Sequence, residues 1–191
     1  MISPSAIIDT GALIGANTKV WAFSHICKNA KIGSNCSIGE GVHIGPNVIV
    51  GDNCKIQNHS LIYEGVTIED HVFIGPNVVT TNDPYPRAFG DWSDRFKKTL
   101  IKRGVGIGAN STILCGLILE EFCMIAAGSV VTDHVMRQSL VKGNPARHIR
   151  FMADTEKSPF SPAFRLEDGS ESLERLTAQI LPCEPPITGK L

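Results

Sequence analysis

A repeat of six residues constrains this sequence more than any other feature. From residue 2 to residue 74, every sixth residue is Ile or Val without a miss. The members are Ile2, Ile8, Ile14, Val20, Ile26, Ile32, Ile38, Ile44, Val50, Ile56, Ile62, Ile68 and Ile74. A spacing of six fits neither the 3.6-residue period of an amphipathic helix nor the two-residue alternation of a long strand. It predicts short strands separated by sharp corners, each strand pointing its aliphatic residue inward.

Two further positions of the repeat have a physical reason. The residue two before each aliphatic is small or medium, as in Ala6 and Thr18, so it faces inward on the same side of the strand. Three residues after the aliphatic stands Asn or Gly in most repeats, and these tolerate the left-handed backbone of a corner. Three edges make a coil of 18 residues, and stacked coils hydrogen-bond at about 4.8 Å. The sequence therefore predicts an all-β stack of three-sided coils, with Cys36, Cys54 and Cys123 as core fillers.

The repeat is interrupted once and then ends. It stops after Thr80 and resumes at Ile101, an interval that is not a multiple of six, which predicts an inserted loop over 81–103. A long loop without periodicity of its own is usually functional. The repeat domain is expected over 1–150 and a C-terminal extension over 151–191, where the apolar spacing predicts a short helix at 171–181.

Composition excludes several classes of protein. A length of 191 residues suits a single domain with a real core, and a net charge of −1 argues against nucleic acid as the main partner. No apolar run reaches the roughly 18 to 20 residues that span a bilayer, and no secretory signal is expected from the first residues. The six cysteines form no C-x-x-C pair, so a reduced chain in the cytoplasm is expected.

The repeat, together with the V-K-G-N-P-A-R segment at 141–147, resembles the hexapeptide-repeat acyltransferases over about residues 2–150. The resemblance implies a left-handed parallel β-helix, acetyl-CoA as co-substrate without a metal, and a homotrimer with active sites between subunits. The handedness comes from the resemblance alone, because the usual crossover rule points the other way. Small residues would let the pantetheine approach the backbone, and two basic residues would meet the phosphates. The implied cofactor contacts are Gly108, Ala126, Ala127, Gly128, Lys142, Pro145 and Arg147.

Residues 56–88 resemble one branch of that family. The blocks I-Q-N, Y-E-G-V-T-I-E-D, F-I-G-P and T-N-D-P-Y-P-R-A are similar to those of its nucleotide-sugar N-acetyltransferases. The nearest likeness is to enzymes that acetylate the 3-amino group of a UDP-linked 2-acetamido-3-amino-glucuronic acid for O-antigen assembly. The resemblance therefore implies a nucleotide-linked amino sugar as the acceptor.

Acetyl transfer to an amine makes modest demands on side chains. An amine with a pKa near 7.7 reaches its neutral form at pH 7 at a cost of about 1 kcal/mol. Positioning and hydrogen bonds to the developing oxyanion can then suffice, whereas a hydroxyl acceptor needs a well-placed base.

Candidate site residues follow from these patterns. Asn82, where the coil gives way to the loop, is the first choice to orient the amine or bind the oxyanion. His59 occupies a corner position with its ring outward, either as a base or as a tolerated corner residue. His25 and His43 stack one coil apart, either lining the groove near the nucleotide or as an accidental ladder. The other predicted substrate contacts are Asn58, Tyr63, Glu64 and Arg87.

Four alternatives stay open. An O-acetyltransferase would use His59 as its base. A γ-type carbonic anhydrase would need three metal-binding histidines, and no third one accompanies His59 and His71 at a convincing spacing. A solenoid scaffold without activity would lack coenzyme A binding. Transfer of longer acyl chains is disfavoured because the loop contains no apolar segment suited to measuring chain length.

Overall fold

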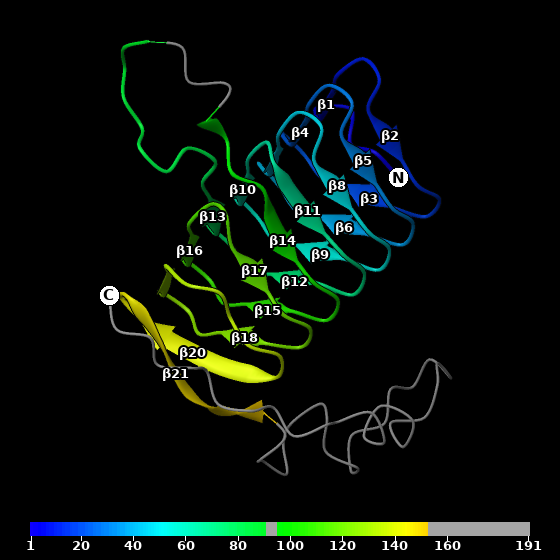
Figure 1. Cartoon of the computed structure of the whole chain (residues 1–191). Helices are drawn as coiled ribbons and strands as arrows, with labels where there is room; N and C mark the ends of the chain where they lie inside the picture. Colours follow the sequence, from blue (N-terminus) through cyan, green and yellow to red (C-terminus); the bar gives the residue numbers. More distant parts are fainter. Residues whose placement is uncertain (91–94, 153–191) are drawn as a thin grey trace, which may run out of the picture. The chain divides into compact units, whose positions relative to one another are not determined.

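Three parallel β-sheets run along a common axis and form the three sides of a β-helix (Figure 1). The structure is a computed structural model that describes residues 1–90 and 95–152. Within these residues there is no α-helix, and nothing long and apolar enough to cross a membrane as a helix.

Each sheet takes one short strand from every coil. Sheet I contains β1 (Ile7–Ile8), β4 (His25–Ile26), β7 (His43–Ile44), β10 (Leu61–Ile62), β13 (Val79–Thr80), β16 (Thr112–Ile113) and β19 (Val130–Val131). Sheet II contains β2 (Leu13–Ile14), β5 (Lys31–Ile32), β8 (Ile49–Val50), β11 (Val66–Ile68), β14 (Thr99–Ile101) and β17 (Ile118–Leu119). Sheet III contains β3 (Lys19–Val20), β6 (Ser37–Ile38), β9 (Lys55–Ile56), β12 (Phe73–Ile74), β15 (Gly106–Ile107), β18 (Met124–Ile125), β20 (Ser139–Gly143) and β21 (Ala146–Phe151).

The register follows the repeat. Ile26 pairs with Ile44 in sheet I, and Ile14 pairs with Ile32 in sheet II, so residues 18 apart occupy equivalent places in neighbouring coils. The predicted three-sided parallel stack is confirmed. Among the described strands only the last departs from it: β20 pairs in parallel with β18, and β21 turns back antiparallel to β20.

The interior is lined by the two predicted inward positions. Ile26, Ile38 and Ile44 are fully buried. Ser24 is also buried, and its Oγ donates a hydrogen bond of 2.7 Å to the Gly39 carbonyl, which satisfies a polar group inside the coil. The inward, buried positions predicted for the three repeat cysteines are confirmed; these are Cys36, Cys54 and Cys123.

Two aliphatic residues of the repeat are not in the core as predicted. Ile2 and Ile8 are exposed. They belong to the first coil, which pairs with a neighbouring coil on one side only among the residues that the structure describes.

The inserted loop ends earlier than predicted. Ile101 pairs with Ile68 and therefore restores the register, but β14 already begins at Thr99. The chain leaves the coils after Thr80 and is back in them at Thr99, rather than after residue 103. Its base is closed by a hydrogen bond of 2.9 Å from the Lys97 N–H to the Asn82 carbonyl. Farther out, Asp83 and Arg95 form an ion pair of 3.4 Å.

The strands end at Phe151, where β21 closes the hairpin. The extension predicted over 151–191, with its helix at 171–181, lies almost entirely outside the described residues and stays a prediction.

The buried aliphatic residues of the repeat are expected to contribute most to the free energy of unfolding. Ile56 is fully buried, whereas Ile49, which points outward, is 45% exposed. We expect Ile56→Ala to lower the free energy of unfolding by about 2 to 5 kcal/mol and Ile49→Ala by less than about 1 kcal/mol. Urea denaturation of the two variants tests this. Equal losses would contradict the assignment of inward and outward faces.

Candidate active site

The candidate residues divide between the two edges of sheet I. We call the corner between sheets I and II the loop edge; it contains residues 28–29, 46–47 and 64–65 and the inserted loop 81–98. The corner between sheets III and I is the hairpin edge; it contains residues 22–23, 40–41, 58–59, 76–77, 109–110 and 127–128 and the turn at 144–145.

Three candidates meet at the base of the inserted loop. The loop leaves and re-enters the coil at the corner of residues 64–65: the Thr99 N–H donates to the Gly65 carbonyl at 3.0 Å, and the Lys97 N–H donates to the Asn82 carbonyl at 2.9 Å. The Tyr63 N–H donates to Thr80 Oγ1 at 2.9 Å, which fixes the backbone beside this corner. Tyr63, Glu64 and Asn82 therefore all belong to the loop edge, and their roles in a site stay predictions.

Polar bonds orient part of this cluster. Glu64 Oε1 accepts a hydrogen bond of 2.8 Å from Asn47 Nδ2, one coil below. Arg87 belongs to the exposed part of the loop, where its Nη1 donates to the Pro86 carbonyl at 2.7 Å. Glu64 is thus held in place by the coil, whereas Arg87 is positioned only by the loop.

The hairpin edge presents small residues to solvent. Ala127 and Gly128 are exposed, and Gly128 has φ +71° with open space where a side chain would stand. The Ala126 N–H donates to the Val141 carbonyl at 2.9 Å, and the Gly143 N–H donates to Ser129 Oγ at 3.2 Å. These bonds place the β20–β21 hairpin directly beside the Ala126–Gly128 corner.

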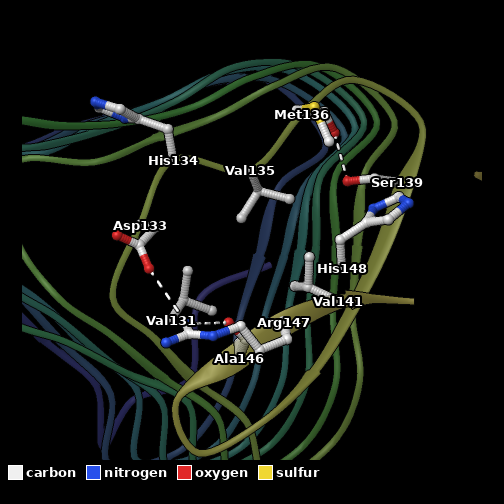
Figure 2. Close-up of a pocket in the computed structure, with 10 residues that line it drawn as sticks. All are labelled: Val131, Asp133, His134, Val135, Met136, Ser139, Val141, Ala146, Arg147 and His148. Carbon is white, nitrogen blue, oxygen red and sulfur yellow. Dashed lines mark hydrogen bonds and ion pairs between the residues drawn. The ribbon is translucent and has the colours of Figure 1, made fainter. Parts of the chain in front are cut away.

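Two basic side chains stand on that hairpin. Lys142 and Arg147 are cross-strand partners, one from β20 and one from β21, and both are exposed. Arg147 Nη1 lies 3.4 Å from Asp133 Oδ2 and donates to the Ala146 carbonyl at 2.9 Å (Figure 2). Because both partners of this ion pair are well exposed, it contributes little and can exchange for a phosphate. Pro145 occupies the adjoining turn.

Gly108 has a structural role of its own. A Cβ on Gly108 would lie 2.5 Å from the Ala127 N of the next coil. Absence of a side chain therefore allows the coils to stack at this corner, whether or not the residue also approaches a cofactor.

His59 and Asn58 lie on the hairpin edge, away from Asn82. His59 adopts φ +60°, as predicted for a corner residue, and its ring stands over Gly41. Asn58 Oδ1 accepts a hydrogen bond of 3.1 Å from the Glu40 N–H, which ties it to the coil below. Within one chain the two candidate catalytic residues, His59 and Asn82, are thus on different edges.

The outward face of sheet I carries a row of rings. His25 and His43 pair in register, as the 18-residue spacing predicts, with ring centroids 5.6 Å apart. The His43 ring lies 5.7 Å from that of Tyr63. Sequence analysis missed two neighbours of this row, Asp9 and Cys27. Asp9 Oδ1 is 3.1 Å from His25 Nε2. The spacing of 18 residues between Asp9 and Cys27 is the signal that would have placed these two residues in neighbouring coils.

Comparison with known families agrees with this architecture. The bacterial transferase hexapeptide (six repeats) model matches residues 11–46, 29–64 and 47–82, and the hexapeptide repeat of succinyl-transferase matches residues 101–133. Together these matches include more than half of the sequence. The chain belongs to the hexapeptide-repeat transferase family.

Individual relatives are similar over shorter stretches. A dTDP-3-amino-3,6-dideoxy-alpha-D-galactopyranose 3-N-acetyltransferase of Aneurinibacillus thermoaerophilus is 48% identical over 54 residues, 28% of each chain. The galactoside O-acetyltransferase of Escherichia coli strain K12 is 30% identical over 105 residues, 53% of this chain and 52% of that one. The matches span between 27% and 52% of the length of these and the other curated relatives.

A solved structure extends the likeness over most of the β-helix. A hexapeptide-repeat acetyltransferase of Vibrio cholerae, crystallised with acetyl coenzyme A, superposes with a TM-score of 0.52 at 25% identity. The alignment covers 74% of this chain and 70% of that one.

Proposed function

We propose that the protein transfers an acetyl group from acetyl-CoA to the amino group of a nucleotide-linked amino sugar. The inserted loop, with Asn82 at its base, rises from the corner that bears Tyr63 and Glu64, and this arrangement carries the proposal. An amide and a carboxylate on one corner suit an acceptor that has both an amine and hydroxyl groups.

The donor fits the hairpin edge. Ala127 and Gly128 leave room for a pantetheine chain to lie against the backbone, and Lys142 with Arg147 offers positive charge for its phosphates. The Vibrio cholerae relative, which has acetyl coenzyme A bound on the same kind of β-helix, supports this choice of donor.

The acceptor fits the loop edge. The neutral amine attacks the thioester carbonyl carbon, a C–N bond forms, and the C–S bond breaks as the tetrahedral intermediate collapses. The coenzyme A thiolate leaves, and the proton lost by the amine nitrogen restores the thiol. Asn82 would orient the amine through its carbonyl oxygen or donate its amide N–H to the oxyanion. Glu64 and Tyr63 would hold sugar hydroxyls.

A homotrimer would complete the site. Donor and acceptor groups lie on different edges of one chain. Packing three copies side by side brings the loop edge of one subunit next to the hairpin edge of its neighbour, which places the thioester beside the amine. We propose this arrangement, with the reaction in the cytoplasm where acetyl-CoA is available.

The sugar is a 3-amino sugar in this proposal, and the finer choice is a UDP-linked 2-acetamido-3-amino-uronic acid for surface polysaccharide. The relative from Aneurinibacillus thermoaerophilus, named for 3-N-acetylation of a dTDP-3-amino sugar, supports the 3-amino position. Arg87, on the exposed loop, would bind the uronate carboxylate bidentately.

A coupled thiol assay tests the function. Purified protein is mixed with acetyl-CoA and the UDP-linked 3-amino-uronate, its dTDP-linked 3-amino-6-deoxy counterpart, or UDP-N-acetylglucosamine, which has no free amine. We expect coenzyme A release with the first two sugars, faster with the uronate, and none with the third. Release with the third sugar alone would overturn amine acylation.

His59 separates this function from O-acetylation. Since an amine needs no strong base, we expect His59→Ala to retain much of the activity. Activity is measured as initial rates at saturating substrates. A loss of about a thousandfold or more would indicate general-base transfer to a hydroxyl, as in the galactoside O-acetyltransferase relative.

The proposed contact between Arg147 and the phosphates of acetyl-CoA can be tested by substitution. We expect Arg147→Ala to raise the KM for acetyl-CoA about tenfold, because a hydrogen bond to a charged group is worth about 1.5 kcal/mol or more. The difference should shrink as salt is added. Lys31→Ala, an exposed basic residue on sheet II, is the control and should leave this KM unchanged. An unchanged KM for Arg147→Ala would remove it from the donor site.

A further inference from the structure

Three side chains with soft ligand atoms converge on the outward face of sheet I. They are His25 on β4, Cys27 just after it, and His43 on β7, and their ligand atoms all lie within 4.8 Å of one another. From this cluster we infer that the protein binds one Zn²⁺ ion, or a similar borderline-soft divalent cation, through His25, Cys27 and His43. The inference does not rest on the proposed acetyl transfer, which needs no metal.

The spacing of the atoms fits tetrahedral zinc. With Zn–S near 2.3 Å and Zn–N near 2.0 to 2.1 Å, neighbouring sulfur and nitrogen ligands are about 3.6 Å apart. Cys27 Sγ lies 3.7 Å from His25 Nε2 and 3.9 Å from His43 Nε2. His43 Nδ1 is equally distant from the sulfur at 3.9 Å, so a modest rotation of the ring aims either nitrogen at a shared ion.

Asp9 lies beside the cluster but is not one of its members. Its Oδ1 is 3.1 Å from His25 Nε2, whereas only the ligand atoms of His25, Cys27 and His43 all lie within 4.8 Å of one another. A water molecule would therefore take the fourth position of a tetrahedral ion. A set of one thiolate and two imidazoles is of the kind that selects zinc over magnesium or calcium.

The backbone holds the ligands before any ion arrives. The His25 N–H donates to the Val42 carbonyl at 2.9 Å, and the Cys27 N–H donates to the Ile44 carbonyl at 2.8 Å. These ladder bonds fix β4 against β7. The three ligand side chains therefore come from a rigid sheet rather than from a loop, which lowers the entropy lost on binding.

Coordination changes the number of bound protons. Zinc takes its sulfur ligand as a thiolate, so binding of the ion releases the Cys27 thiol proton to solvent as the Zn–S bond forms.

Titration of the tag-free full chain with Zn²⁺ against a chromophoric chelator tests the inference, without sugar or acetyl-CoA. We expect one equivalent to bind tightly. Cys27→Ser and His43→Asn should each weaken binding by at least about 100-fold, since even an outer-shell partner is worth 10- to 100-fold. Cys115→Ser and His71→Asn are matched controls outside the cluster and should bind as the unchanged protein does.

Cobalt gives a second readout that does not depend on affinity. Co²⁺ bound to a thiolate shows a near-ultraviolet charge-transfer band, which we expect in the unchanged protein and in Cys115→Ser but not in Cys27→Ser. Absence of one-to-one binding, or a band that survives Cys27→Ser, would overturn the site. Because no acetyl transfer is measured, these outcomes leave the proposed function to be judged by its own assay.

Discussion

Replacing Asn82 by alanine is expected to lower kcat by about 100- to 1000-fold, because one oxyanion-hole donor is worth that much in acyl transfer. The KM values for both substrates should change little, since the lost interaction strengthens only in the transition state. Asn82 stands at the base of the loop, where its carbonyl accepts a hydrogen bond from the Lys97 N–H, and the proposal places the reacting amine beside it. Steady-state kinetics with the UDP-linked 3-amino-uronate measures the effect.

A control in the same loop separates catalysis from loop structure. Tyr85 is 71% exposed, and its bond to Asp83 is made by the backbone N–H, which alanine keeps. We expect Tyr85→Ala to keep near-normal kcat. Thermal unfolding of Asn82→Ala should match that of the unchanged protein. Full activity in Asn82→Ala would move the reaction centre elsewhere.

A bulky residue at the Ala126–Gly128 corner is expected to abolish acetyl-CoA binding. Ala127 is exposed and belongs to the corner where the pantetheine would lie against the backbone. In Ala127→Trp the indole would occupy that volume without burying itself in the core. We expect the affinity for acetyl-CoA to fall by at least about 100-fold, equivalent to about 2.7 kcal/mol. Isothermal titration calorimetry measures the loss.

Ala22→Trp is the matched control for this substitution. Ala22 occupies the same corner position as Ala127, several coils away toward the N-terminus on the hairpin edge. The two variants therefore make the same chemical change in the same local geometry. Ala22→Trp should bind acetyl-CoA normally, and equal affinities in the two variants would show that coenzyme A does not lie at the 126–128 corner.

The repeat made most of the fold predictable because each position of the six-residue repeat has one physical cause. Ile26 and Ile44 point inward because successive side chains of a strand alternate between its two faces. His59 has a positive φ because it occupies the corner position of the repeat. The exposure of Ile8 was not predictable from its position in the repeat alone. It depends on the first coil pairing on one side only among the described residues, which is a property of the stack rather than of the six residues.

The loop boundary and the sites were harder to predict. The break in the repeat located the insertion. The aliphatic position of the repeat resumes at Ile101, whereas the strand already begins at Thr99, so the return to the coil was predicted too late in the sequence. For the cluster on sheet I, the spacing of His25 and His43 predicted their stacking. Cys27 directly follows the repeat residue Ile26, at a position where the repeat itself indicates no chemical role, so the sequence did not predict its place in the cluster. The assignment of Asn82 and Arg147 rests on resemblance and stays a prediction.

Identification of the bond formed tests the central claim most directly. Acetyl-CoA labelled with carbon-13 at the carbonyl is incubated with the protein and the UDP-linked 3-amino-uronate, and the product is examined by NMR. The account predicts a labelled amide at the 3-amino nitrogen, with one coenzyme A released for each amide. A labelled ester on a hydroxyl, or no labelled product with any nucleotide-linked amino sugar, would contradict it.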